Sequence, residues 1–394
     1  MRESLKIIIF DGSFKTTTFI NRLALGLAKK HKVFILGFNE EHKIKIPNVT
    51  YISLGSNQNY YRLAIVSLKY ALKTKKTSVF NVLKKLILRN KKSLQKQNLD
   101  FVLNEIKPDI IHLQWLANIP FFEDYIDEGR HKFVLSQRGY HINVRPFVNE
   151  ANFKYLQKWF PKINGFHSVS KAIKKVSEKV YNSIDKIDRV VYSGLDFSSF
   201  NFEKKTKSNN SKLEIVSVGR DHWIKGYTYA IKAMAILKNK NISFHYTIIG
   251  VSEKSEELIY FINDNNLEEN ITLIPHLNQN DVYAVIQKSD LLILPSLEEG
   301  IANVCIEAMA LGTTVISTNC GGMEELITNN ETGFIVPVRN PEAIAKSVLE
   351  FKEMDSENMN VIRKKARLQV EKQHNEAKMI ADMETLYKKV YEGN

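Results

Sequence analysis

Cysteine is nearly absent from this sequence: of its 394 residues, only Cys305 and Cys320 are cysteines. Two cysteines exclude a disulfide framework, and a reducing cytoplasm is the simplest setting for such a chain. Both cysteines stand at apolar or glycine-flanked positions. This placement favours small core residues over nucleophiles or metal ligands.

Long apolar runs are also missing. No stretch approaches the roughly 18 apolar residues of a membrane span, and the run 7–10 is too short for a secretory signal, so it predicts a first strand. No Asp-x-Asp triplet occurs and the histidines lack zinc-like spacing, so we expect no bound metal. The first loop has one glycine, Gly12, and therefore no dinucleotide fingerprint, which argues against a nicotinamide enzyme.

Acidic residues do not balance the basic ones. The chain has 56 lysines and arginines against 43 aspartates and glutamates, a net charge of +13 at pH 7. This charge calls for an anionic partner: nucleic acid, a membrane surface or a phosphorylated substrate. The nucleic-acid interpretation depends on net charge alone, because no recognised nucleic-acid-binding motif is present.

The segment 69–97 contains no acidic residue. Its basic residues are Lys69, Lys73, Lys75, Lys76, Lys84, Lys85, Arg89, Lys91, Lys92 and Lys96, and its apolar helical face is formed by Val79, Leu83, Leu86 and Ile87. We expect a basic amphipathic helix on an anionic membrane surface, where each basic residue contributes roughly 1 kcal/mol. The alternative is a solvated face on a helix that packs internally.

The alternation of short aliphatic runs with amphipathic helices predicts an α/β fold, and the length suggests two domains or a little more. Expected strands of the first half are 6–10, 33–37, 109–114, 133–136 and 165–170, the last running into a helix at 171–180. Those of the second half are 213–218, 244–250, 271–274, 291–294 and 313–318. Between the halves, the polar segment 203–212 has the composition of an exposed linker.

The segment 291–318 predicts a strand, a polar loop, a helix, a glycine stop and a second strand. Its loop and helix start therefore face the carboxyl edge of a sheet, where open α/β sheets bind ligands. Glu299 in the loop and Glu307 in the helix both reach a ligand over the first helical turn. The free N–H groups of residues 301–304 suit a phosphate. Together these groups fit a sugar nucleotide; the alternative is two solvated surface charges.

The residues around Glu299 and Glu307 favour a ligand site over two solvated surface charges. The pattern resembles the donor-site signature of glycosyltransferase family 4, the retaining enzymes of the GT-B fold, in these residues: Pro295-Ser296, Glu299-Gly300, Asn303-Val304, Glu307-Ala308-Met309-Ala310, Gly312, Gly321-Gly322 and Glu325. The resemblance implies two Rossmann-like doubly wound domains that face a central cleft. It places an acceptor domain at 1–202, a nucleotide-sugar donor domain at 203–375 and a C-terminal helix, 376–394, on the first domain.

The resemblance also implies roles for single residues. Arg220 and Lys225 grip the donor diphosphate, Glu307 binds the ribose hydroxyls and Glu299 binds the transferred sugar, so Glu299, Arg220 and Lys225 are the predicted catalytic residues. The predicted donor-binding residues are Gly12, Arg220, Lys225, Glu299, Gly300, Ile301, Ala302, Asn303, Val304 and Glu307. Where family members often carry His-Gly at a strand end, this chain has Arg138, with His141 three residues later. Both are candidate acceptor-binding residues, and both fit ordinary loop residues equally well.

The predicted function is sugar transfer from a nucleoside-diphosphate sugar to a saccharide or lipid-linked acceptor, without metal or cofactor. By analogy the product is a bacterial surface polysaccharide or glycolipid, made in the cytoplasm or on the inner face of its membrane. A sugar-nucleotide epimerase shares the architecture and would turn over donor without an acceptor. A nucleic-acid-binding protein and an inactive sugar-binding relative rank below these two enzymes.

Overall fold

A computed structural model describes residues 4–38, 45–74, 76–202 and 212–393. The predicted linker at 203–212 falls almost wholly outside these residues, as does Lys75. The chain forms two compact units. Unit 1 comprises Met1–Val169, Lys174–Gly194 and Glu376–Asn394, and unit 2 comprises Ser170–Ile173 and Leu195–Asn375.

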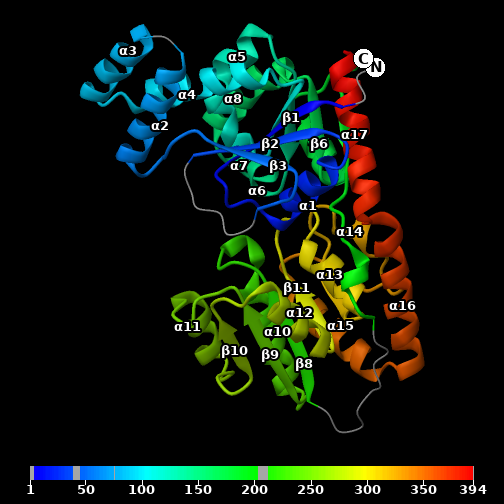
Figure 1. Cartoon of the computed structure of the whole chain (residues 1–394). Helices are drawn as coiled ribbons and strands as arrows, with labels where there is room; N and C mark the ends of the chain where they lie inside the picture. Colours follow the sequence, from blue (N-terminus) through cyan, green and yellow to red (C-terminus); the bar gives the residue numbers. More distant parts are fainter. Residues whose placement is uncertain (1–3, 39–44, 75, 203–211, 394) are drawn as a thin grey trace. The chain divides into compact units, whose positions relative to one another are not determined.

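Unit 1 is built on a parallel sheet with the strand order β3-β2-β1-β4-β5-β6-β7 (Figure 1). Its strands are β1 (Lys6–Gly12), β2 (Lys32–Gly37), β3 (Val49–Ser53), β4 (Ile110–Leu113), β5 (Phe133–Gln137), β6 (Gly165–Ser168) and β7 (Asp188–Val190). The main helices are α1 (Thr18–Leu27), α2 (Tyr60–Lys73), α3 (Lys76–Ile87), α4 (Lys91–Ile106), α5 (Glu123–Glu128), α6 (Tyr140–Asn143), α7 (Arg145–Val148), α8 (Glu150–Trp159), α9 (Lys171–Glu178, of which residues 171–173 belong to unit 2) and α17 (Glu376–Glu392). A 3₁₀ helix, η1 (Leu116–Phe121), follows β4.

Unit 2 repeats this design with the parallel order β10-β9-β8-β11-β12-β13. Its strands are β8 (Leu213–Val218), β9 (Phe244–Ile249), β10 (Ile271–Ile274), β11 (Leu291–Leu294), β12 (Thr314–Thr318) and β13 (Phe334–Val336). Its helices are η3 (Phe197–Ser199), η4 (Trp223–Lys225), α10 (Tyr227–Asn239), α11 (Glu256–Asp264), α12 (Gln279–Lys288), α13 (Asn303–Leu311), α14 (Met323–Leu326), α15 (Pro341–Glu353) and α16 (Ser356–Gln373). Two Rossmann-like α/β units confirm the predicted fold class.

Each sheet has a point at which the strand order changes direction. In unit 1, β1 lies between β2 and β4, and in unit 2, β8 lies between β9 and β11. The connections leaving such neighbouring strands run to opposite faces of the sheet, and their carboxyl ends open a ligand-binding crevice. The loops after β1 and β4, and those after β8 and β11, are therefore the places to look for functional residues.

The last helix, α17, belongs to the core of unit 1. Its side chains Met379, Met383, Leu386 and Tyr387 are buried with those of α1 and the central strands. Gly26 of α1 permits this packing, because a Cβ at that position would overlap the Cδ1 of Ile380 on α17. The chain thus returns to the unit in which it began.

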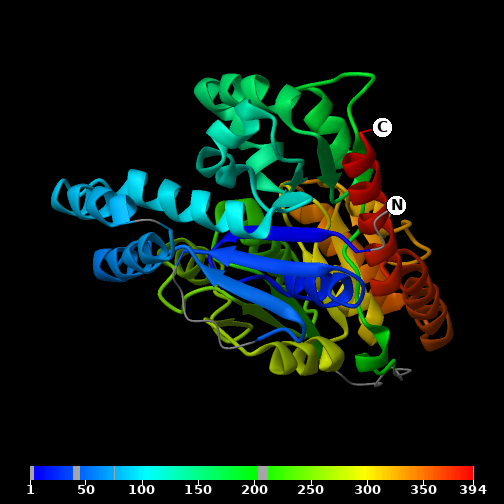
Figure 2. The ribbon, with the colours of Figure 1, turned by 45° about the horizontal axis from the view of Figure 1, so that its top comes forward.

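Helices α2, α3 and α4 extend away from the unit 1 sheet in both views (Figures 1 and 2). The single helix expected over 69–97 is instead shared among these three helices. Arg89 adopts a left-handed backbone with φ of 49°, and the Asn90 side chain accepts a hydrogen bond from the backbone N–H of Ser93, so a new helix begins there. We call α2, α3 and the first turn of α4 the helical arm.

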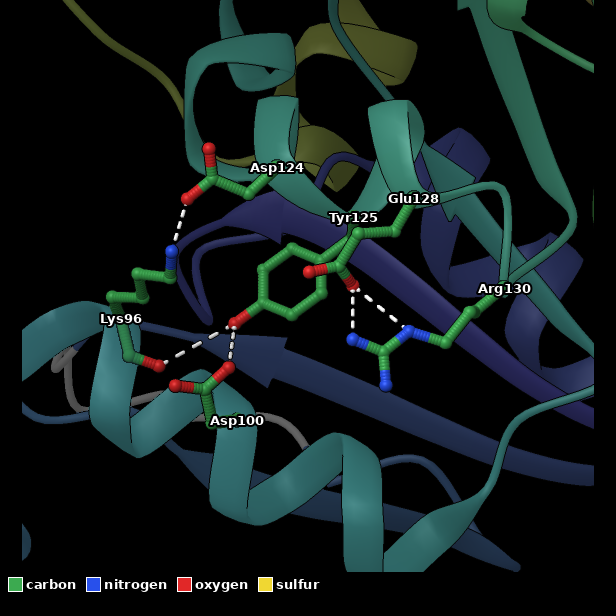
Figure 3. Close-up of polar contacts among 6 residues, drawn as sticks. All are labelled: Lys96, Asp100, Asp124, Tyr125, Glu128 and Arg130. Atoms are coloured by element: carbon green, nitrogen blue, oxygen red, sulfur yellow. Dashed lines mark hydrogen bonds and ion pairs between the residues drawn. The ribbon is translucent and has the colours of Figure 1, made fainter.

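The arm is held to the rest of unit 1 through α4. Tyr125 of α5 donates its hydroxyl hydrogen bond to Asp100 of α4 at 2.5 Å, and Lys96 of α4 forms an ion pair with Asp124 (Figure 3). Burial raises the pKa of the Tyr125 hydroxyl, and the hydrogen bond to Asp100 adds to the rise. Tyr125 therefore stays a neutral donor at physiological pH, and Lys96 is engaged within the protein.

Candidate functional site

The carboxyl edge of the unit 2 sheet brings Lys225 and Glu299 together. Lys225 lies at the end of η4, after β8, and Glu299 lies in the loop after β11. The Lys225 Nζ is 2.6 Å from the Glu299 Oε1, which also accepts a hydrogen bond from the Ser296 hydroxyl at 2.9 Å. The two charged side chains are only 18% and 15% exposed. A cation and an anion are thus fixed at the point where a ligand is expected.

Backbone hydrogen bonds join the loop after β8, which carries Lys225, to the loop after β11, which carries Glu299. The N–H of Leu297 donates to the carbonyl of Ile224 at 2.7 Å, which ties the loop after β11 to the loop after β8. The loop after β12 supports Glu299 from the other side. Gly321 has a φ of 53°, and a Cβ there would overlap the Glu299 carbonyl oxygen, so only glycine fits. The next residue, Gly322, donates its N–H to the Gly300 carbonyl at 2.9 Å.

Helix α13 presents its amino end at the same edge. Its N-cap residue, Ala302, has no side-chain oxygen and makes no side-chain cap hydrogen bond. The first N–H groups and the positive end of the helix dipole are suited to an anion at this position. Glu307, one turn into the helix, is 9% exposed, and its Oε1 accepts a hydrogen bond from the Tyr283 hydroxyl at 3.1 Å.

A second cation, Arg220, follows β8 and is exposed. His222 lies between the two cations in sequence and accepts a hydrogen bond from the Ile224 N–H at its Nδ1, at 3.2 Å. Burial lowers the pKa of His222, and the nearby charges of Arg220 and Lys225 lower it further. The neutral imidazole of His222 thus accepts a backbone hydrogen bond within the turn that carries Lys225.

The structure therefore brings Arg220, Lys225, Glu299, Glu307 and the segment 300–304 to one edge of unit 2. The residues that the sequence did not reveal are Tyr283 and His222, whose bonding partners are set by the fold.

Glu325, which also belongs to the family motif, has a different set of partners. Its carboxylate accepts hydrogen bonds from the backbone N–H groups of Lys171 and Ala172 at 2.9 and 2.7 Å, at the start of α9. Cys305 and Cys320 are buried free thiols, as expected of core residues.

The remaining candidates lie in unit 1. Gly12 ends β1 with a φ of 86°. Arg138 follows β5, where its guanidinium carbon is 4.1 Å from the ring centre of Phe19. His141 lies in α6, and its ring centre is 6.2 Å from that of Trp115. These three residues share the carboxyl edge of the unit 1 sheet.

Neither a metal cluster nor a membrane span is present in the described parts of the chain. No group of three or more histidine, cysteine, aspartate or glutamate side chains is placed there to hold a metal ion. No helix among the same residues is both long and apolar enough to cross a bilayer.

Residues 198–369 match the family described as "Glycosyl transferases group 1". Among curated proteins, the chain is 31% identical over 189 residues to the putative colanic acid biosynthesis glycosyltransferase WcaL of Escherichia coli K12, covering 46% of each chain. It is 32% identical over 193 residues to the amylovoran biosynthesis glycosyltransferase AmsK of Erwinia amylovora, covering 48% of this chain and 47% of that one. These matches span about half the length of the curated relatives.

Solved structures resemble nearly the whole chain. The sucrose-phosphate synthase of Thermosynechococcus elongatus superposes with a TM-score of 0.78 at 16% identity, covering 99% of this chain and 100% of the other. Anabaena Alr3699/HepE in complex with UDP and glucose gives a TM-score of 0.73 at 15% identity, covering 98% and 100%. At this identity the likeness establishes the fold, which is that of GT-B glycosyltransferases.

Proposed function

We propose that the protein transfers a sugar from a nucleoside-diphosphate sugar to a saccharide or lipid-linked acceptor, because residues 198–369 match the group 1 glycosyltransferase family. The observation that carries the proposal is the Lys225–Glu299 pair, which lies at the strand-order switch of unit 2 with Arg220 and Glu307 at the same edge. This set combines cations for phosphates with carboxylates for hydroxyl groups.

In the proposed reaction, Arg220, Lys225 and the amino end of α13 stabilise the charge that develops on the departing nucleoside diphosphate. Electrostatic groups that are fixed in place before the reaction commonly lower a barrier by several kcal/mol. Glu307 holds the ribose hydroxyls and Glu299 holds hydroxyls of the transferred sugar. Transfer occurs with retention of the anomeric configuration, by attack on the face from which the leaving group departs.

We further propose that this charge stabilisation needs no metal ion. Support comes from the sequence, which has no Asp-x-Asp triplet, and from two cationic side chains that follow β8 closely. Transfer that persists at an undiminished rate in EDTA is the expected result. Loss of transfer in EDTA with recovery on adding Mg²⁺ or Mn²⁺ would refute metal independence.

The product we propose is a bacterial surface polysaccharide or glycolipid. Two similar curated proteins are named for colanic acid and amylovoran biosynthesis, and a solved structure of the same fold is the lipopolysaccharide outer core galactosyltransferase WaaB. An acceptor carried on a lipid would bring the enzyme to a membrane surface, and the helical arm has the composition to contact one.

The helical arm carries two apolar stripes that face solvent. On α3, Phe80, Leu83 and Ile87 are 72%, 45% and 82% exposed, at the i, i+3 and i+7 positions of one helical face. On α2, Tyr61, Ile65 and Leu72 are 82%, 65% and 75% exposed, again on one face. A second face of each helix is buried in a small core of Leu63, Ala71, Val82 and Leu94.

Basic residues accompany these stripes: Lys69, Lys73, Lys84, Arg89, Lys91 and Lys92 are all exposed. Apolar side chains that enter a lipid surface and cations that contact anionic headgroups form a standard interfacial pattern. We therefore propose an anionic membrane surface as the partner of the arm, with the enzyme peripheral to it. An anionic membrane surface accounts for the positive charge of the arm without a nucleic-acid partner.

Sugar transfer is tested with Lys225→Ala and Glu307→Ala. Purified protein is incubated with a saccharide acceptor and a panel of nucleoside-diphosphate sugars, whose binding is first ranked by thermal shift, and the release of nucleoside diphosphate that depends on the acceptor is measured. Either substitution should lower turnover by about a hundredfold or more, the usual cost of removing one fixed stabilising group. Lys232→Ala, an exposed lysine on the neighbouring helix α10, is the matched control and should leave turnover unchanged.

Full activity of Lys225→Ala or Glu307→Ala, with the fold retained by circular dichroism, would refute the assigned site. The epimerase alternative predicts another pattern: the donor sugar would be epimerised in the absence of any acceptor, and product analysis by NMR would show the inverted sugar. An inactive relative would bind a nucleotide sugar without turnover.

A further inference from the structure

A cavity of about 490 Å³ lies between α2, α3 and α4 in the region of the helical arm. Its polar lining includes Lys84 and Lys85 of α3 and Gln97, Asp100 and Asn104 of α4. Sites for small molecules commonly have volumes of about 300–1,000 Å³. The cavity is therefore large enough to enclose a small polar group.

The two lysines and Gln97 offer hydrogen-bond donors to a ligand. The Lys85 Nζ donates a hydrogen bond to the Gln97 Oε1 at 2.8 Å, which holds this ammonium group between α3 and α4. No described residue accepts a hydrogen bond from the Gln97 Nε2 or forms an ion pair with Lys84. Lys84 is exposed, and Lys85 and Gln97 are partly exposed, so a ligand can reach all three. Lysine ammonium groups are common binders of phosphate.

A carboxylate lies further along the same cavity. The helical rise of 1.5 Å per residue places Asp100 about 4.5 Å beyond Gln97 along α4. The Asp100 Oδ1 accepts a hydrogen bond from Tyr125 (Figure 3), and no described residue donates one to its second oxygen. Next to it, the rings of Tyr70 and Phe101 are stacked with their centres 4.6 Å apart, and both line the cavity. An acceptor for a hydroxyl group is thus available a short distance from the lysines.

The exposed rim of the cavity adjoins the apolar stripe of α3. Leu83 and Ile87 belong to the stripe that is proposed to enter a lipid surface, and the residue after each, Lys84 and Leu88, lines the cavity. Consecutive residues of an α-helix lie about 100° apart around its axis, so the two sets share neighbouring parts of the helix surface. A headgroup of the same lipid surface is therefore within reach of the cavity.

We propose that this cavity binds the headgroup of an anionic phospholipid that carries hydroxyl groups, as phosphatidylglycerol does. Lys84, Lys85 and the Gln97 amide bind the phosphodiester, and Asp100 accepts a hydrogen bond from a headgroup hydroxyl. Two lysines and one aspartate are the charged residues of the lining, which gives it a net charge of +1. The single negative charge of a phosphodiester balances this charge, whereas a zwitterionic headgroup leaves it unbalanced.

This inference rests on the proposed membrane partner of the arm and assigns that partner a specific site. The exposed stripes and cations attract an anionic surface without selecting a headgroup. The cavity selects one, because its lysines and its carboxylate are held in fixed positions relative to each other.

Gln97→Glu tests the site with almost no change in side-chain shape. The new carboxylate pairs with Lys85 where the two side chains already meet, so the helices stay in place, and it repels a phosphate. Lys92→Gln is the matched control: Lys92 is exposed on the same helix and does not line the cavity, and each substitution lowers the charge by one. Binding of dihexanoyl phosphatidylglycerol is measured by titration calorimetry below its critical micelle concentration, where no bilayer surface is present.

Wild type and Lys92→Gln should bind this lipid with similar Kd values, and Gln97→Glu should bind it about tenfold more weakly or worse. For wild type, the dihexanoyl forms of phosphatidylethanolamine and phosphatidylcholine, and inorganic phosphate, should also bind about tenfold more weakly than phosphatidylglycerol. Each of them lacks either the net negative charge or the glycerol hydroxyls. Absence of phosphatidylglycerol binding in wild type, unchanged binding in Gln97→Glu, or equal binding of inorganic phosphate would overturn the headgroup site.

Failure of the headgroup site is distinguishable from failure of the proposed function. A wild-type protein that sediments with phosphatidylglycerol vesicles but binds no short-chain lipid keeps its membrane partner and loses the headgroup site. Sugar transfer is measured separately, with a saccharide acceptor and without lipid. A protein that binds the short-chain lipid but transfers no sugar would refute the proposed transfer and keep the headgroup site.

Discussion

Among single residues, the proposed ribose contact depends on how Glu307 is held. Its carboxylate is mostly buried, and the Tyr283 hydroxyl donates to its Oε1 at 3.1 Å. Tyr283 is itself packed on Phe200, with the ring centres 5.0 Å apart. A hydrogen bond to a charged group contributes roughly 1.5–3 kcal/mol. Tyr283 is therefore a positioning residue, which acts on the ligand through Glu307.

Tyr283→Phe removes this hydrogen bond and keeps the ring. We expect the Kd for UDP to rise by about tenfold, because a less restrained Glu307 carboxylate holds the ribose less well. Calorimetry with UDP and with 2′,3′-dideoxy-UDP isolates the effect: the variant should lose affinity for UDP and keep its affinity for the dideoxy nucleotide. An equal loss for both would show that Tyr283 acts on the fold and not on the ribose contact.

The sequence predicted the site residues better than it predicted their partners. Glu299 and Glu307 were identified from one helix start, and the structure places Lys225 against Glu299 although 74 positions separate them. Tyr283 was missed because its bond to Glu307 joins two helices whose packing no local spacing encodes. Arg138 was noticed as a lone loop cation. Its stacking on Phe19 depends on α1, which is distant in sequence, and the same holds for its hydrogen bond to Gln114.

Among the helices and strands, the most reliable predictions were buried parallel strands. The bounds 213–218, 271–274 and 291–294 agree with β8, β10 and β11 because a strand buried on both faces is a continuous aliphatic run. The segment 69–97 was the main error. Charge and apolar content predicted one helix, but Arg89 takes a left-handed conformation and Asn90 caps a new helix there. Composition does not reveal that break.

The helical arm yields a prediction of its own. Phe80→Ser with Ile87→Ser removes exposed apolar area, and Lys84→Gln with Arg89→Gln and Lys92→Gln removes three exposed cations. At roughly 1 kcal/mol for each basic residue near an anionic surface, the triple variant should bind anionic vesicles about a hundredfold more weakly. Co-sedimentation with vesicles containing phosphatidylglycerol measures this, and the double serine variant should also bind more weakly.

The matched control for the arm is Lys364→Gln with Lys365→Gln and Lys372→Gln, three exposed lysines of α16 in unit 2. It lowers the net charge without touching the arm, so its vesicle binding should stay near that of wild type. Vesicles of phosphatidylcholine alone should bind all variants weakly. Equal losses in the arm and control variants would mean that net charge, and not the arm, attracts the lipid.

Across the full chain, the path leaves unit 1 after Gly194 and returns to it at Glu376. Helical periodicity alone does not show which core α17 completes, because an amphipathic helix at a chain end fits either unit; the family resemblance is what places this helix on the first domain. The structure shows what the return contributes: Met379, Met383, Leu386 and Tyr387 are all nearly or wholly inaccessible. At about 1.5–3 kcal/mol for each buried side chain, these four residues contribute an amount comparable to the roughly 5–15 kcal/mol stability of a typical domain.

Truncation after Asn375 should therefore unfold unit 1 and leave unit 2 folded, since no residue of unit 2 follows that point. Hydrogen-exchange mass spectrometry should show lost protection in β1, β4 and β5 and unchanged protection in β8 and β11. UDP should still protect the segment 296–307, because Arg220, Lys225, Glu299 and Glu307 all remain. A control truncated after Glu392 should match the full chain. Loss of protection in both units at once would show that they fold as one cooperative body.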